Sequence, residues 1–232
     1  MTIEIPKTPQ IPLEIDYEDQ RYDQRYDKRY DKRYDDDEDE NENENEEIIW
    51  IDLYEGIYLE RLIFLSGVID NAVVTDIISL LLFFGVEDDD IFLYINSPGG
   101  EALSGIAICD TINALIPDVS TLVMGFAASV ASLILSGGSY TKRGAFPHAR
   151  VMIHQPVIAP ISASPEILAS EAEEMVQLRS TIADIYAKNT GKPVSVIQQD
   201  LERDKYMSAL EARNYGILDT VIEERIKDGT SE

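Results

Sequence analysis

The chain has 232 residues, a length that suits one domain of ordinary size with or without a tail. Hydrophobic residues make up 44% of it, enough to build a core, while 44 acidic and 19 basic residues give a formal net charge of −25. A chain this acidic repels the phosphates of nucleic acids and the headgroups of anionic lipids, so we exclude both as partners.

The first 47 residues differ in composition from the rest of the chain. A four-residue unit, Arg-Tyr-Asp followed by one variable residue, occurs four times between Arg21 and Asp36, and the run Asp35–Glu47 contains only Asp, Glu and Asn. Such a run offers no apolar face and its like charges repel, which predicts a disordered extension over residues 1–47. We interpret the repeats as a low-complexity insertion without chemistry; the alternative is a flexible polyampholyte that a partner recognises.

From Trp50 onward, strand patterns alternate with helix patterns. In chain order we predict a strand over 61–66, a helix over 72–84, a strand over 91–95, a helix over 102–115, a strand over 119–124, a helix over 127–135, a strand over 151–154 and a helix over 165–189. The last helix begins at Pro165 and ends before Gly191. This alternation predicts an α/β fold of stacked units, with residues 48–232 as one domain.

Two features of the predicted helices bear on whether the chain spans a membrane and on the redox compartment in which it folds. The longest apolar run, Ile77–Val86, is too short to span a bilayer and is interpreted as part of a core helix. The single cysteine, Cys109, cannot form an internal disulfide, which favours a reducing compartment. Its neighbours Ile108 and Asp110 continue a helical pattern, so we expect a packed structural thiol and not a nucleophile.

The segment Gly125–Ala131 is the first candidate for chemistry. An apolar strand ends there, and small residues then open a helix at Ser129. A hydroxyl at a helix N-terminus lies beside free backbone N–H groups and the positive end of the helix dipole, which stabilise an oxyanion. The alternative is a serine that caps or packs the helix. The pair Gly99–Gly100 after the preceding strand allows backbone N–H groups to point at a ligand, or forms an ordinary turn.

Histidine is the usual general base near neutral pH, and the chain has only two. His148 follows Pro147 in a polar turn, where we expect it to be exposed. His154 closes a β-branched strand, a common place for catalytic side chains, so we take it as the candidate base.

An acidic partner for this histidine is less clear from spacing. Asp204 precedes a helix start at Ser208–Glu211 that has capping-box spacing. Spacing alone does not separate Asp204 from Asp200 or Asp219 as the carboxylate that orients the histidine.

Four motifs carry a family resemblance. They are, in chain order, Tyr94–Gly100, Gly125–Val130, Arg150–Pro156 and Glu202–Ala209. Together they resemble the proteolytic subunits of the ATP-dependent Clp protease (the ClpP family, peptidase S14) over about residues 50–226, and four motifs in fixed order are highly specific. The segment Thr141–Arg150 and the opening Ile5–Pro9 resemble the plastid-encoded form in particular.

The resemblance implies a serine endopeptidase with a Ser-His-Asp triad. By position, Ser129 matches the nucleophile, His154 the general base and Asp204 the orienting acid. The backbone N–H groups of Gly100 and Val130 match the oxyanion hole. In that mechanism the histidine takes the serine proton, the aspartate holds the ring and stabilises its positive charge, and the two amides hold the tetrahedral oxygen.

The resemblance also implies an architecture and partners. The expected fold is α/β, of the ClpP/crotonase type, with stacked βαβ units and a protruding handle from Gln155 to about Gln177. Heptameric rings of Clp proteolytic subunits would stack as a tetradecamer and receive unfolded protein from an AAA+ unfoldase chaperone in the plastid (chloroplast) stroma. The sequence contains no P-loop, so ATP use is assigned to the unfoldase. We expect neither a cofactor nor a metal in this chain.

Departures from the family pattern bear on details of this expectation. The segment Val157–Ser162 lacks the glycines that family members often carry after the histidine motif, and it contains Pro160, which removes a strand hydrogen-bond donor. Glu101 follows Gly100 directly, and its carboxylate would oppose a forming oxyanion unless it points away. The extension stands where the family has its axial loop region, so it could filter substrates or alter unfoldase docking.

Other readings remain open from sequence alone. Plastid Clp cores also contain architectural subunits that lack the triad, and crotonase-type acyl-CoA enzymes share a related fold and a similar oxyanion hole. An acidic scaffold acting through the extension would explain only that part of the chain. Phe92 and Tyr94 are either part of an unfoldase docking pocket, as in the family, or core packing.

Overall fold

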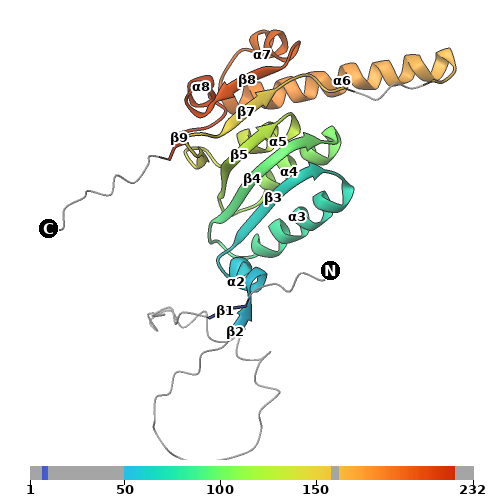
Figure 1. Ribbon diagram of the computed structural model, residues 1–232. Helices are drawn as coiled ribbons and strands as arrows, with labels where there is room; N and C mark the ends of the chain where they lie inside the picture. Colours follow the sequence, from blue (N-terminus) through green and yellow to red (C-terminus); the bar gives the residue numbers. More distant parts are fainter. Residues whose placement is uncertain (1–6, 10–49, 158–161, 223–232) are drawn as a thin grey trace, which may run out of the picture. The chain divides into compact units, whose positions relative to one another are not determined.

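The computed structural model describes residues 7–9, 50–157 and 162–222 (Figure 1). Apart from β1 (Lys7–Pro9), the expected extension over residues 1–47, with its repeats and acidic run, lies outside the described residues. The chain divides into two compact units, residues 1–59 and 60–232. In the first unit, β1 pairs antiparallel with β2 (Trp50–Asp52), and the helix α2 (Leu53–Leu59) follows.

The second unit is built on a seven-stranded sheet. Five strands lie in the order β3 (Leu62–Ile69), β4 (Ile91–Gly100), β5 (Val119–Ala128), β6 (Arg143–Ala145) and β9 (Thr220–Val221), and all these neighbours pair in parallel. The strand β7 (Arg150–Ile153) pairs in parallel with the end of β5 and antiparallel with β8 (Lys205–Ser208). The end of β5 therefore lies beside the strand that leads into His154.

Helices connect these strands as the alternation predicted. They are α3 (Asn71–Phe84), α4 (Ala102–Ala114), α5 (Val130–Ser136), α6 (Pro165–Thr190), α7 (Val194–Leu201) and α8 (Ala209–Tyr215). The prediction of an α/β fold of βαβ units is confirmed. Within the described residues, no helix combines the length and apolar character needed to cross a bilayer.

Alternating burial along the strands places the core. In β4, Ile91, Leu93 and Ile95 are buried, and they belong to one apolar cluster with Ile77 and Leu81 of α3. The helix α3 begins at an N-cap, Asp70, whose carboxylate accepts hydrogen bonds from the amides of the first turn.

The buried thiol of α4 is also as expected. Cys109 is buried in the core cluster, and burial raises the pKa of its thiol to about 12. A thiol held neutral in this way is a poor nucleophile. The prediction of a packed structural cysteine is confirmed.

Strands run further than the sequence predicted. The strand β3 continues past Gly67, β4 continues through Pro98 to Gly100, and β5 ends at Ala128, so α5 begins at Val130 and not at residue 127. Register shifts between Ser66 and Val68 in β3, and between Ile95 and Ser97 in β4, explain the difference. Such irregularities let pairing resume around a proline, which has no N–H to donate.

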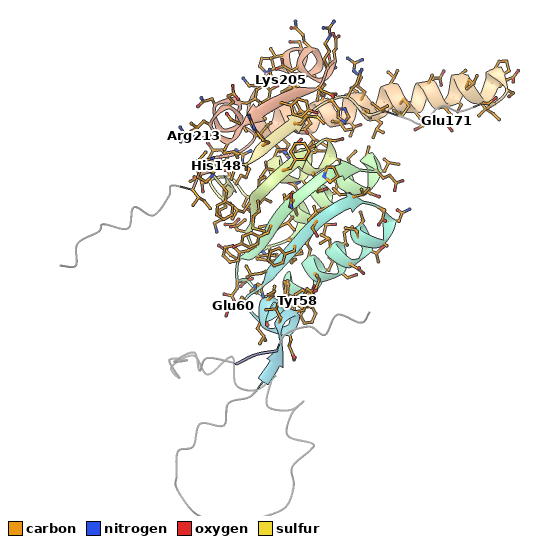
Figure 2. All side chains as sticks on the ribbon, viewed as in Figure 1. Tyr58, Glu60, His148, Glu171, Lys205 and Arg213 are labelled. Atoms are coloured by element: carbon orange, nitrogen blue, oxygen red, sulfur yellow. The ribbon has the colours of Figure 1, made fainter. Side chains whose placement is uncertain are left out.

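The long helix α6 has two halves of different character. It starts at Pro165 and ends at Gly191, which takes a left-handed φ of 72° and donates to the carbonyl of Ala187, as the sequence predicted. Buried side chains occur only in the second half, beginning at Ile182, while the first half extends beyond the sheet (Figure 1). Glu171 lies on this projecting half (Figure 2). Pro160 of the preceding segment lies outside the described residues.

A buried ion pair joins β6 to the residue before β9, and the same arginine also binds α6. Arg143 is 4% exposed, and its Nε donates to Oδ2 of Asp219 over 2.8 Å. Its Nη1 donates to the carbonyl of Asn189 over 2.9 Å. Burial alone would raise the pKa of Asp219, but the hydrogen bonds and charge of Arg143 outweigh it and hold that pKa below its usual range.

We expect Asp219→Ala to lower the free energy of unfolding by about 3–5 kcal/mol, because it leaves the Arg143 charge buried without its partner. Because the carboxyl pKa is lowered on folding, this stabilisation is present above the unfolded pKa and is lost as pH falls through the folded pKa. Denaturant unfolding followed by circular dichroism at pH 7 measures the change. The exposed Asp88 provides the control Asp88→Ala, and equal losses for both variants would contradict the prediction.

Candidate active site

Ser129 lies in the turn between β5 and α5. Its φ of 55° and ψ of −129° are unusual for a residue with a side chain. Although Ser129 occupies the N-cap position, its hydroxyl makes no capping hydrogen bond. Its amide donates to the carbonyl of Met152 in β7 over 2.9 Å. The capping alternative raised by the sequence is therefore wrong for this serine.

The hydroxyl of Ser129 meets the imidazole of His154. The separation between Oγ and Nε2 is 2.9 Å, a hydrogen-bonding distance. His154 follows directly after β7, whose pairing with the end of β5 brings the two residues together. In the neutral tautomer that carries its proton on Nδ1, Nε2 accepts a hydrogen bond from the hydroxyl of Ser129.

Asp204 lies on the other side of the same ring. Its Oδ1 is 3.3 Å from Nδ1 of His154, and its side chain is 58% exposed. The two rival carboxylates have other partners: Asp200 accepts from the hydroxyl of Tyr215 over 2.7 Å, and Asp219 is bound to Arg143. The geometry thus separates three aspartates that spacing left equivalent, and it places Asp204 beside the histidine.

The second histidine lies elsewhere. His148 is exposed in the turn between β6 and β7, as predicted, and Figure 2 labels it there. Only His154 of the two is placed beside Ser129.

The glycine pair at the end of β4 lies against the serine. A Cβ added to Gly99, which has a φ of +93°, would come within 2.8 Å of Cβ of Ser129 and 2.7 Å of the carbonyl oxygen of Ala128. Only glycine allows so close an approach at this φ. Gly100 ends β4 and Val130 begins α5, and the register that sets Ser97 opposite Ala127 brings these ends to one edge of the sheet. Their role as an oxyanion hole stays a prediction.

Ser97 supports this edge and was missed by the sequence analysis. Its hydroxyl is buried, donates to the carbonyl of Gly67 over 2.6 Å and accepts from the amide of Gly99 over 3.0 Å. A serine bonding to the amide two residues later is a local turn motif, so the Ser-Pro-Gly spacing was the available signal.

The carboxylate of Glu101, which lies directly before α4, has a partner in that helix. Ser104 Oγ donates to Oε2 of Glu101 over 2.9 Å, in the first turn of α4. The amide of Glu101 donates to the carbonyl of Ile69 over 2.9 Å. Both bonds fix this residue at the start of α4.

A cavity of about 350 Å³ lies apart from these residues, over β4, β5 and β6. Phe92, Tyr94, Leu122 and Lys142 are among its lining residues. Phe92 is 39% exposed, and Tyr94 stacks on Phe64 with ring centroids 5.3 Å apart. Phe92 is therefore not a core residue of this chain.

Among the described residues, no group of three or more His, Cys, Asp or Glu side chains is placed to hold a metal ion. The chemistry available at the site is that of a hydroxyl, an imidazole and a carboxylate in series. A hydroxyl in hydrogen-bond contact with an oriented base is the arrangement of an activated nucleophile.

Comparison with known proteins identifies a family. A family model described as Clp protease matches residues 43–225. Chloroplastic ATP-dependent Clp protease proteolytic subunit 1 of Arabidopsis thaliana is 51% identical over 174 residues, which cover 74% of this chain and 89% of that protein. An ATP-dependent Clp protease proteolytic subunit of Phalaenopsis aphrodite subsp. formosana is 47% identical over 187 residues, covering 80% of this chain and 92% of that protein.

A third relative agrees with these two. The ATP-dependent Clp protease proteolytic subunit of Barbarea verna is 50% identical over 174 residues. The matched region contains Ser129, His154 and Asp204, and it contains the whole described sheet of the second unit. The resemblance and the fold type inferred from the four motifs are confirmed: the chain belongs to the Clp protease family.

Proposed function

We propose that this chain is a serine endopeptidase subunit of a barrel-shaped, ATP-dependent Clp protease, and that it cleaves unfolded proteins to short peptides. The observation that carries the proposal is the contact of Ser129 Oγ with Nε2 of His154 over 2.9 Å, with Asp204 beside the other ring nitrogen. Family membership and the names of the plastid relatives support the same activity.

In the proposed mechanism, Ser129 Oγ attacks the scissile carbonyl while His154 Nε2 takes its proton. Asp204 keeps the ring in the required tautomer and stabilises its positive charge. The backbone N–H groups of Gly100 and Val130 would hold the tetrahedral oxygen. His154 then gives its proton to the leaving amine, and a water activated by the same imidazole releases the acyl group from Ser129.

The assembly is inferred from the family. We propose that other Clp proteolytic subunits complete heptameric rings stacked as a tetradecamer, in the plastid stroma. An AAA+ unfoldase would use ATP and deliver substrate, so this chain would need no cofactor. The partly exposed Phe92 and the cavity it lines offer an apolar surface suited to an unfoldase loop. We assign the peptidase domain to residues 48–232 and the acidic extension to 1–47.

Labelling with a fluorophosphonate tests the activity directly, because the reagent reacts with an activated serine and not with an ordinary hydroxyl. The assembled complex is labelled, and the modified peptide is located by mass spectrometry. We expect label on Ser129 and none after heat denaturation. No label in a correctly assembled ring would refute the proposal and move the chain to the architectural class of subunit.

We expect Gly99→Ala to lower peptide hydrolysis more than about a hundredfold, because the added methyl would displace the backbone on which Ser129 depends. Gly191→Ala is the matched control: Gly191 has a similar φ of +72°, but nothing lies within 4 Å of its added Cβ. Hydrolysis of a fluorogenic peptide by the two purified assemblies measures the difference. A wild-type rate for Gly99→Ala would show that the close approach is irrelevant to catalysis.

A further inference from the structure

Two buried hydroxyl groups lie close to the main chain of Ser129, and the catalytic triad does not use either of them. Ser132 of α5 is 0% exposed, and Tyr186 of α6 is 1% exposed. Their oxygens are 2.7 Å apart. Ser132 Oγ also lies 2.7 Å from the carbonyl oxygen of Ser129 and 2.8 Å from that of Met152. The Tyr186 hydroxyl lies 3.2 Å from the same Ser129 carbonyl.

The number of protons that the two hydroxyls can donate limits the hydrogen bonds that this cluster can form. Each hydroxyl has one proton to donate, and the two carbonyls can only accept. If Tyr186 donates to Ser132, then Ser132 donates to the carbonyl of Ser129 or of Met152. If Tyr186 donates to the carbonyl of Ser129, then Ser132 can donate to the carbonyl of Met152. In each arrangement the pair binds the main chain of Ser129, of Met152 or of both.

These two carbonyls belong to the segments that carry the reacting groups. Met152 lies two residues before His154, and its carbonyl also accepts the amide of Ser129 over 2.9 Å. Ser132 thus bonds across the junction between the turn of Ser129 and the strand of His154. Burial raises the pKa of Tyr186, which keeps its hydroxyl neutral and able to donate.

The backbone of Ser129 needs such support. A residue with a side chain at a φ of 55° and ψ of −129° is in a sparsely populated region of backbone conformation, which is energetically unfavourable. Conformations of this kind persist only where the surroundings over-determine them. Tyr186 comes from the buried half of α6, so the helix that projects beyond the sheet also contributes to the turn of the nucleophile.

We propose that Ser132 and Tyr186 are positioning residues, which hold the main chain of Ser129 and Met152 so that Oγ of Ser129 meets Nε2 of His154. This inference rests on the proposed peptidase function of the same site. Neither residue touches substrate in this proposal; both act through the backbone.

The same two helices offer a matched control. One turn further along, Ser136 of α5 is buried, donates to the carbonyl of Leu133 over 2.7 Å and accepts from Nδ2 of Asn189 of α6 over 3.1 Å. This contact also joins α5 to α6 through a buried hydroxyl, but Ser136 Oγ bonds to neither Ser129 nor Met152. Ser136→Ala therefore tests loss of a buried hydroxyl without loss of positioning.

The test compares Ser132→Ala, Tyr186→Phe, their combination and Ser136→Ala in the assembled complex. For the first two, we expect kcat for a fluorogenic peptide to fall about tenfold with KM unchanged, and fluorophosphonate labelling of Ser129 to slow by the same factor. The combined variant should lose little more than either alone, because the hydroxyls act as a unit. Ser136→Ala should keep the wild-type kcat, even if its thermal stability is lower than that of the wild type.

Each other outcome has a distinct meaning. If wild-type Ser129 is labelled and both positioning variants keep its rate, the inference is wrong and the proposed function stands. If Ser136→Ala slows labelling as much as they do, the effect is loss of packing and the inference is again wrong. If Tyr186→Phe does not fold, Ser132→Ala alone decides. Absence of label on wild-type Ser129 would remove the proposed function and this inference together.

Discussion

Peptide hydrolysis by this subunit is expected to fall at least about a thousandfold when Ser129 is replaced by alanine. The substitution removes the oxygen that would form the acyl-enzyme, so only direct attack by water remains. Covalent labelling by a fluorophosphonate should disappear at the same time. Both are measured on the assembled complex in which every copy of this chain carries the change, so that any other subunits contribute a constant background.

The fold should tolerate this change. The hydroxyl of Ser129 caps no helix, and its hydrogen-bond partner is the imidazole of His154. Thermal unfolding of Ser129→Ala should therefore match the wild type closely. Ser79→Ala serves as the control, since Ser79 is exposed on α3 and its hydroxyl donates only to the carbonyl of Thr75 in the same helix. Hydrolysis that survives in Ser129→Ala and is lost in Ser79→Ala would place the chemistry elsewhere.

Local sequence patterns were enough to predict most of the helices and strands. The alternation of Ile91, Leu93 and Ile95 identified a strand, and Pro165 and Gly191 marked both ends of α6 because their backbone preferences are intrinsic. The continuation of β4 through Pro98 could not be foreseen in this way. It depends on register shifts against β3 and β5, which are properties of the neighbours and not of the segment itself.

The site was predictable to the extent that its residues stand in motifs. Ser129 and His154 follow strand ends, where parallel strands bring side chains to one edge. Asp204 could not be chosen over Asp219 by spacing, because the choice depends on Arg143, 76 residues away, binding Asp219. Tyr186 carries no motif at all: its contact with Ser132 spans 54 residues and exists only once α6 has packed on α5.

The second large effect concerns the base. We expect His154→Ala to reduce peptide hydrolysis by about as much as Ser129→Ala, because a serine without its base keeps its proton and is a weak nucleophile. His148→Ala is the natural control, as it removes the other histidine, which is exposed in the turn before β7. The measurement is kcat/KM for a fluorogenic peptide together with the rate of labelling at Ser129. A wild-type labelling rate in His154→Ala would refute the assignment of the base.

Combined substitutions test whether Ser129, His154 and Asp204 act together in the same catalytic step. The double variant Ser129→Ala with His154→Ala should lose no more than either single variant, because each alone already disables the same step. Asp204→Ala should lose less, since its carboxylate is 58% exposed and lies 3.3 Å from Nδ1, where water can replace part of its effect. Additive losses in the double variant would mean that Ser129 and His154 contribute to different steps, despite the 2.9 Å between them. An Asp204→Ala loss as large as that of His154→Ala would mean that the carboxylate binds the imidazole more tightly in the assembled complex than in the single chain.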